Sequence, residues 1–266
     1  MAVGDCPADL AGHLEHLQRT LPATTYTIVS QPPFVVIGDE PAALVHDRAV
    51  STVGWAVDRL KQDFFTNDPP DIIDIWLRKD PASYAACARA ILGNQPLIQL
   101  GFYARAQHAL VINLAADAGT LVHEIVHPFI HANFPDCPPW FNEGLASLFE
   151  RAAERDGHII GLPNWRVSQL QRLIRADRCP TIAAVTAMDP VEFYYRDEAD
   201  NYAVARGLCY YLQERGQLVP FYRAFRANCR TDPTGLRTLQ QTLQEADLDR
   251  LQIHWEKFVR TLTVTN

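Results

Sequence analysis

The chain has 266 residues, of which 48% are hydrophobic and 21% are charged. This length and composition exclude a disordered tail, a collagen-like fibre and a small disulfide scaffold, and they fit one large domain or two packed subdomains. The formal charge is −7, from 24 basic and 31 acidic residues. No basic stripe stands out along the chain, so we expect no nucleic-acid partner.

Features that bear on the cellular compartment are few. No apolar run approaches the roughly 18 residues of a transmembrane helix, so we expect no membrane span. Residues 1–6 lack the basic and apolar regions of a signal peptide. If a signal has been removed ahead of them, we expect an exported protein, periplasmic or secreted. The six cysteines are widely spaced without a C-x-x-C pair, which leaves free thiols and disulfides both open.

Strands and helices are mixed in the first half of the sequence. Runs of β-branched and apolar residues predict strands at 25–29, 34–38, 72–77, 97–103 and 109–114. Helical spacing of apolar residues and helix-start signals predict helices at 39–65 and 80–92, and a further helix that begins near Thr120.

The second half of the sequence is almost wholly helical by the same criteria. The predicted helices are 140–154, 165–176, 181–188, 201–214, 219–227, 236–245 and 248–263. The sharpest break is the proline-rich stretch 134–139. We therefore predict an α+β fold, in which a strand-rich lobe with a mixed sheet and helices (1–137) precedes a mostly helical lobe (138–266).

Residues 123–127, His-Glu-Ile-Val-His, fit the pattern H-E-x-x-H. Side chains at i and i+4 share one face of a helix, so two imidazoles there can reach one zinc ion at about 2.0–2.1 Å each. Glu124 can flank the metal without binding it, which is the position of a base that takes a proton from metal-bound water. The motif therefore predicts a zinc site made by His123 and His127, with Glu124 beside it.

A third zinc ligand is available downstream. Glu143 follows His127 by 16 residues, and a turn at 135–139 would let a second helix fold back toward the first. The alternative ligand is His131. However, histidines at i, i+4 and i+8 span about 12 Å along a straight helix, which is too far for three ligands of one zinc ion. We therefore expect Glu143 to complete the site.

These segments resemble zinc metallopeptidases of the gluzincin type, the group that contains thermolysin-like and aminopeptidase N-like catalytic domains with the peptidase MA-like fold. The resemblance rests on His-Glu-Ile-Val-His at 123–127, Trp-Phe-Asn-Glu-Gly-Leu-Ala at 140–146 and Asn-Tyr-Ala-Val-Ala-Arg-Gly-Leu at 201–208. It extends over roughly residues 97–212.

The resemblance implies a role for each matching residue. It implies that zinc is held by His123, His127 and Glu143. Glu124 is implied as the general base and then the general acid, and Tyr202 as the group that stabilises the oxyanion. The resemblance thus implies hydrolysis of peptide bonds.

Several neighbouring residues keep alternatives open. The resemblance implies that Glu150 orients a zinc-bound histidine, whereas an exposed helix charge is the simpler interpretation. Tyr194 and Tyr195 are alternatives to Tyr202 as the oxyanion donor. Cys137 lies in the connecting loop and could close the zinc site as a fourth ligand, which would make the site structural.

The sequence departs from the family pattern at two places. Pro128 directly follows His127, and a proline within a helix removes one hydrogen bond and favours a kink. No Glu occurs between residues 95 and 120, where aminopeptidase N-like enzymes carry the Glu that holds the substrate's amino group. We therefore expect an enzyme that is not a strict aminopeptidase.

The functional hypothesis is a zinc metallopeptidase that acts on a peptide or protein substrate, with the zinc cleft between the two lobes. An edge strand, expected at 109–114, would pair with the extended substrate. The alternative is a non-catalytic protein that uses the zinc site for structure or for binding a partner. The oligomeric state cannot be inferred from the sequence.

Overall fold

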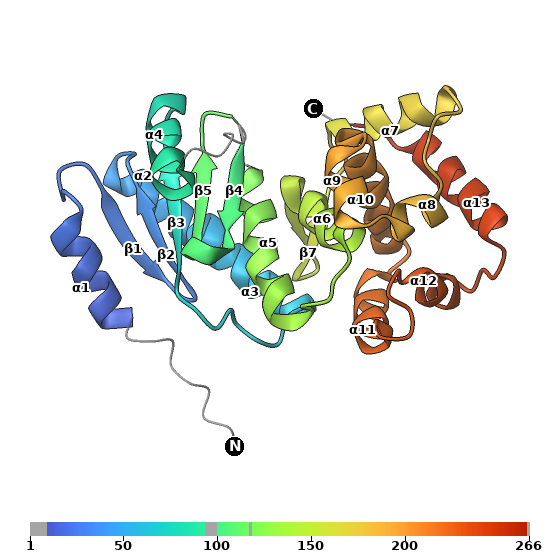
Figure 1. Cartoon of the computed structure of the whole chain (residues 1–266), viewed down its shortest axis with the longest axis horizontal. Helices are drawn as coiled ribbons and strands as arrows, with labels where there is room; N and C mark the ends of the chain where they lie inside the picture. The colour runs from blue at the N-terminus through green and yellow to red at the C-terminus, as the bar shows by residue number, and fades with distance from the viewer. Residues whose placement is uncertain (1–9, 94–99, 117–118, 265–266) are drawn as a thin grey trace, which may run out of the picture. The chain divides into compact units, whose positions relative to one another are not determined.

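The computed structural model describes residues 10–93, 100–116 and 119–264. Cys6 and residues 97–99 of the expected strand 97–103 lie outside these ranges. The fold is α+β, as predicted, with a mixed sheet in the first half and mainly helices in the second (Figure 1). No helix among the described residues is long and apolar enough to span a membrane.

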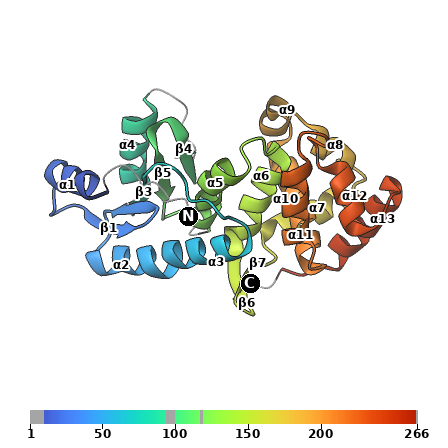
Figure 2. The ribbon, with the colours of Figure 1, turned by 90° about the horizontal axis from the view of Figure 1, so that it is seen from below.

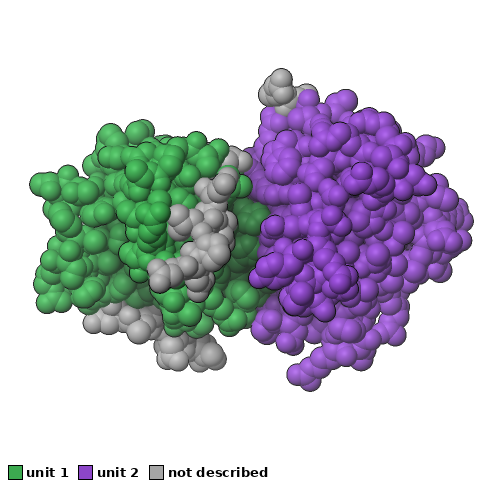
Figure 3. All heavy atoms as spheres, turned by 45° about the horizontal axis from the view of Figure 1, so that its top comes forward, with its two compact units in different colours: residues 1–61, 66–132 green, residues 62–65, 133–266 purple. Residues whose placement is uncertain are grey.

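The chain divides into two compact units, which Figure 3 shows in different colours. Unit 1 comprises Met1–Lys61 and Thr66–Ala132. Unit 2 comprises Asn133–Asn266 together with the short segment Gln62–Phe65.

The sheet of unit 1 has five strands in the order β1-β2-β3-β5-β4. Their bounds are Thr27–Gln31 (β1), Phe34–Gly38 (β2), Ile73–Arg78 (β3), Gly101–Ala104 (β4) and Ala109–Asn113 (β5). The three central strands β2, β3 and β5 are parallel, and the outer strands β1 and β4 are antiparallel to their neighbours.

The expectation that strand 109–114 lies at the edge of the sheet was wrong. The outer strand is β4, which pairs with β5 as an antiparallel hairpin. Only the three-residue turn Arg105–Gln107 and His108 join the two strands. So short a connection places β4 directly beside β5. Because β5 also pairs with β3 on its other side, β5 lies in the interior of the sheet. The fully buried pattern of β5 agrees with this position.

Helices cover both faces of this sheet. On one face, α1 (Leu10–Thr20) packs Leu17 against Val35 and Ile37, and α4 (Pro81–Leu92) packs Tyr84 against Phe102. On the other face, α5 (Thr120–Asn133) brings Phe129 against Phe34, with ring centroids 6.0 Å apart. Burial on both faces explains the continuous apolar sequences of β2 and β5.

The expected helix 39–65 forms as three consecutive helical segments along the sheet (Figure 2). They are α2 (Ala42–Asp47), the π-helical segment η1 (Arg48–Gly54) and α3 (Trp55–Asp63). Val53, Ala56 and Leu60, which recur at helical spacing along these segments, are all buried.

Unit 2 is mainly helical. Its helices are α6 (Pro139–Leu148), α7 (Trp165–Arg175), α8 (Ile182–Ala187), α9 (Pro190–Tyr195), α10 (Glu198–Glu214), α11 (Leu218–Asn228), α12 (Leu236–Leu243) and α13 (Leu248–Thr261). The long helix α10 is buried along most of its length and packs against α6, α7 and α13.

The expected helix 140–154 is too long, because α6 ends at Leu148 and a hairpin follows. Strands β6 (Ala152–Arg155) and β7 (His158–Gly161) pair through a two-residue turn. Asp156 and Gly157 in this turn have φ angles of 53° and 81°. An Asp-Gly pair accepts such left-handed angles readily, and this stabilises the hairpin over a longer helix.

Candidate metal centre

Helix α5 carries the H-E-x-x-H motif and is buried on several sides. Ile125, Val126 and Phe129 are fully buried, and Leu121 and Ile130 are nearly so. Pro128, where the sequence predicts a kink, lies inside α5, and the helix extends beyond it to Asn133. Apolar packing before and after the proline stabilises the helix despite the hydrogen bond that Pro128 cannot donate to the carbonyl of Glu124.

Helix α6 begins with Pro139, a favoured residue at the first helical position. Trp140 is fully buried among aromatic rings, including that of Phe225, and its indole N–H donates a 2.9 Å hydrogen bond to the carbonyl of Thr234. Gly144 lies so close to α10 that a Cβ there would come within 2.8 Å of the carbonyl oxygen of Ala205. These contacts fix the rotation of α6 and therefore the direction in which Glu143 points.

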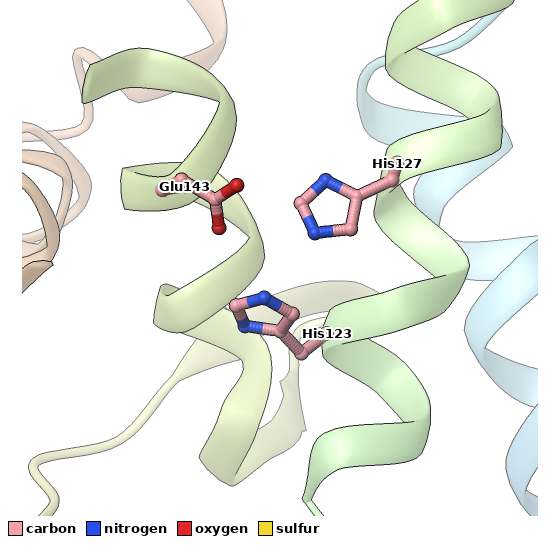
Figure 4. Close-up of side chains that lie close together, drawn as sticks. All are labelled: His123, His127 and Glu143. Carbon is pink, nitrogen blue, oxygen red and sulfur yellow. The ribbon is translucent and has the colours of Figure 1, made fainter. Parts of the chain in front are cut away.

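The predicted ligands His123, His127 and Glu143 come together. One potential ligand atom from each side chain lies within 4.8 Å of the other two. Figure 4 shows the two imidazole rings of α5 and the carboxylate of α6 pointing toward one another. The three residues are between 5% and 9% exposed. This group of two imidazoles and one carboxylate is a donor set that could hold a metal ion.

Tyr194, at the end of the short helix α9, contacts the carboxylate of this group directly. Its hydroxyl donates a hydrogen bond of 2.8 Å to Oε1 of Glu143. Burial raises the pKa of Tyr194 well above its ordinary value, and the charge of Glu143 raises it further. The phenol is therefore protonated across the working pH range and can only donate to Glu143.

Tyr202, the predicted oxyanion donor, lies on α10 and is also close to Glu143. Burial raises the pKa of its hydroxyl far above the ordinary value, and the Glu143 carboxylate adds to this effect. Its ring packs against Phe193, and the guanidinium of Arg166 lies 5.1 Å from its ring centroid. Tyr202 is therefore a neutral donor near the carboxylate of the metal group.

Glu124, the predicted base, lies on α5 next to His123 and is 7% exposed. Its carboxylate is close enough to Tyr84 of α4 to contribute to a raised tyrosine pKa of about 12, although burial is the larger cause. Glu124 is not among the three grouped ligands. This agrees with a residue that flanks a metal rather than binding it.

Three residues considered as alternatives have other surroundings. The ring of His131 lies against Tyr103, with centroids 6.1 Å apart, and is not in the group. Cys137 is also outside the group, and burial raises the pKa of its thiol well above the ordinary value. Glu150 forms an ion pair with Arg166 at 2.7 Å and accepts a hydrogen bond from Asn164. The described cysteines, which are Cys87, Cys137, Cys179, Cys209 and Cys229, are free thiols.

The contact between Tyr194 and Glu143 was not predicted from the sequence. Tyr194 was considered there only as an alternative oxyanion donor. The two residues are 51 positions apart, and α9 was not among the predicted helices. One sequence signal was present, since Asp189 followed by Pro190 is a favourable start for a helix that would carry Tyr194.

The fold and this site define an α+β protein with a candidate metal centre. Residues 117–234, a little under half of the chain, match the family model described as "Protein of unknown function (DUF1570)". The matched region contains His123, His127, Glu143, Tyr194 and Tyr202. No curated protein matches the chain. The family description assigns no activity, so the function has to be argued from the site itself.

Proposed function

We propose that the protein is a zinc-dependent metallopeptidase that hydrolyses peptide bonds in a peptide or protein substrate. The observation that carries this proposal is the group formed by His123, His127 and Glu143 on two buried helices. Glu124 lies on the same helix as the two histidines, in the sequence position of a general base.

The donor atoms fit a zinc ion. Ligands at about 2.0–2.2 Å from a tetrahedral zinc ion lie roughly 3.3–3.6 Å from one another. The atoms of the three side chains are within 4.8 Å of one another, so small side-chain rotations suffice to close around the ion. Two imidazoles and one carboxylate suit zinc better than the all-oxygen sets preferred by Mg²⁺ or Ca²⁺. Three protein ligands also leave a fourth position for substrate or water, as in catalytic rather than structural zinc sites.

The chemistry divides between the metal and the side chains around it. Zinc bound there would lower the pKa of a water molecule and polarise the carbonyl group of the scissile bond. Glu124 accepts the proton that the attacking water loses and passes it to the departing amine. Because Glu124 is buried, little bulk water reaches the carboxylate that transfers the proton.

Two tyrosines support the reaction in different ways. Tyr194 holds Glu143 by its 2.8 Å hydrogen bond and so orients one ligand. Tyr202 remains our assignment for the hydroxyl that donates to the carbonyl oxygen as negative charge develops on it. Its raised pKa keeps the proton on the hydroxyl, which this role requires.

The direct test is digestion of a broad peptide mixture by the purified protein, with the cleavage products identified by mass spectrometry. We expect cleavage that a zinc chelator abolishes and that one equivalent of added zinc restores. A protein that retains one metal ion per chain but cleaves no peptide would contradict the proposal. That result would favour the alternative, a non-catalytic protein that uses the metal for structure or for binding a partner.

A further inference from the structure

A second feature of unit 1 is a pocket of about 850 Å³ beside the C-terminal half of α5. One wall is formed by Pro128 and His131 of α5. Another is formed by Tyr103 at the end of β4 and by Arg105 in the turn that follows. The segment before β3 closes a third side and includes Asp68 and Asp71.

This pocket adjoins the histidine pair of the candidate metal centre. His131 comes four residues after His127, so it lies on the same helical face about 6 Å further along the axis. The outer strand β4 ends at Ala104, and Arg105 follows directly. An extended peptide that adds to the sheet along β4 would therefore run toward Arg105.

Arg105 lies outside the ion pairs that the other charged side chains of the pocket form with described residues. Asp68 lies 2.7 Å from the amino group of Lys61, and Asp71 lies 3.6 Å from Nδ1 of His108. Arg105 forms no ion pair with any residue that the structure describes, and its side chain is exposed. A guanidinium group without an ion-pair partner at the end of the outer strand matches a carboxylate, which it can bind through two parallel hydrogen bonds.

Ring and proline side chains on two walls of the pocket suit contact with a peptide. The rings of Tyr103 and His131 lie with centroids 6.1 Å apart and an angle of 42° between their planes, and Pro128 lies beside them in the lining of the pocket. The pocket therefore combines one guanidinium group with aromatic and proline side chains that can contact a peptide.

We propose that this pocket binds a carboxylate of the peptide substrate through Arg105. The carboxylate is either that of an Asp or Glu side chain or that of the C-terminus. This inference rests on the proposed peptidase function, because it places the pocket on the path of a peptide that lies along β4.

The test measures binding separately from cleavage. Full-length protein with Glu124→Gln, which we expect to be unable to hydrolyse peptides, is titrated calorimetrically with three acetyl-capped alanine pentapeptides. The first is amidated and has no carboxylate, the second has a free C-terminus, and the third is amidated but contains one Glu. We expect the peptide with the matching carboxylate to bind more tightly than the neutral peptide. Adding Arg105→Gln should remove that preference, a loss of roughly five- to twentyfold for a partly solvated charged contact.

Arg89→Gln is the matched control, since Arg89 is an exposed arginine of α4 that does not line the pocket. It should leave the preference unchanged. Equal binding of all three peptides, or an equal loss with both arginine variants, would overturn the pocket assignment even if the wild type cleaves peptides. Conversely, an Arg105-dependent preference in a protein whose wild type cleaves nothing would support the pocket and contradict the peptidase function.

Discussion

The hydroxyl of Tyr194 donates a 2.8 Å hydrogen bond to Oε1 of Glu143. Glu143 is the residue that completes the group with His123 and His127, and it is held on a helix whose rotation is fixed by Trp140 and Gly144. The hydrogen bond restricts the rotation of the carboxylate that the helix itself leaves free. The direction of this ligand is thus determined by contacts within unit 2.

Removal of the Tyr194 hydroxyl should therefore weaken metal binding. Loss of a group that orients a metal ligand typically lowers metal affinity by roughly 10–100-fold, and we expect Tyr194→Phe to lower zinc affinity by a factor in this range. A competition titration with a chromophoric chelator measures the effect. The control is Tyr195→Phe, because Tyr195 is 83% exposed. If both variants bind zinc as tightly as the wild type, Tyr194 has no part in holding the metal.

Tyr202 is predicted to act on the reaction rather than on the metal. Loss of one oxyanion donor usually lowers kcat by about 10²–10³-fold, so Tyr202→Phe should lower kcat by this factor while zinc content and KM change little. Steady-state kinetics on a cleaved peptide, with metal analysis of the same sample, separates the two tyrosines. Near-normal kcat in Tyr202→Phe, with Tyr194→Phe or Tyr195→Phe inactive, would transfer the role to that neighbour.

The ligand set can be tested by metal content alone. We expect about one zinc ion per chain and at least a roughly tenfold loss of affinity in Glu143→Ala, because a direct ligand is removed. His131→Ala and Cys137→Ser should retain the metal, since neither residue belongs to the group. Elemental analysis after dialysis measures this. Metal loss in His131→Ala or Cys137→Ser, with none in Glu143→Ala, would refute the assignment.

The sequence predicted the relative positions of site residues that are close in the chain or regularly spaced along a helix. The i, i+4 spacing placed His123 and His127 on one face of α5, and the proline-rich turn brought Glu143 back toward them. The position of Tyr194 was not predictable, because its contact with Glu143 depends on how α9 packs on α6. Such packing is set by side chains far apart in the chain, and no local pattern encodes it.

Two predictions about the fold were wrong for different physical reasons. The hairpin of β6 and β7 could have been recognised from Asp156 and Gly157, but the predicted helix was continued to residue 154, into β6. The position of β4 outside β5 depends on the order of strands in the sheet. Strand order follows from tertiary packing, so the composition of residues 109–114 could not reveal it.

If the protein is the proposed peptidase, it should not require a free substrate N-terminus. No Glu lies between residues 95 and 120 to hold the amino group, and the outer strand β4 carries none. An acetyl-capped peptide and its uncapped form should therefore be cleaved at similar rates, within about twofold. An amino group that no residue binds in the transition state does not change the rate of cleavage. Chromatographic rate measurements on the paired peptides check this. A strong preference for the uncapped peptide would show that another acidic residue holds the amine.

In the proposed mechanism, Glu124 performs proton transfer at a metal site formed by its neighbours. An amide in place of its carboxylate can form hydrogen bonds but cannot accept a proton near neutral pH. The decisive measurement compares wild-type and Glu124→Gln protein at equal, measured zinc content on the same peptide. We predict unchanged metal content and melting temperature with a roughly 10²–10⁴-fold lower rate of cleavage, the usual contribution of general acid–base catalysis. Undiminished cleavage by the zinc-loaded Glu124→Gln protein would contradict the proposed mechanism.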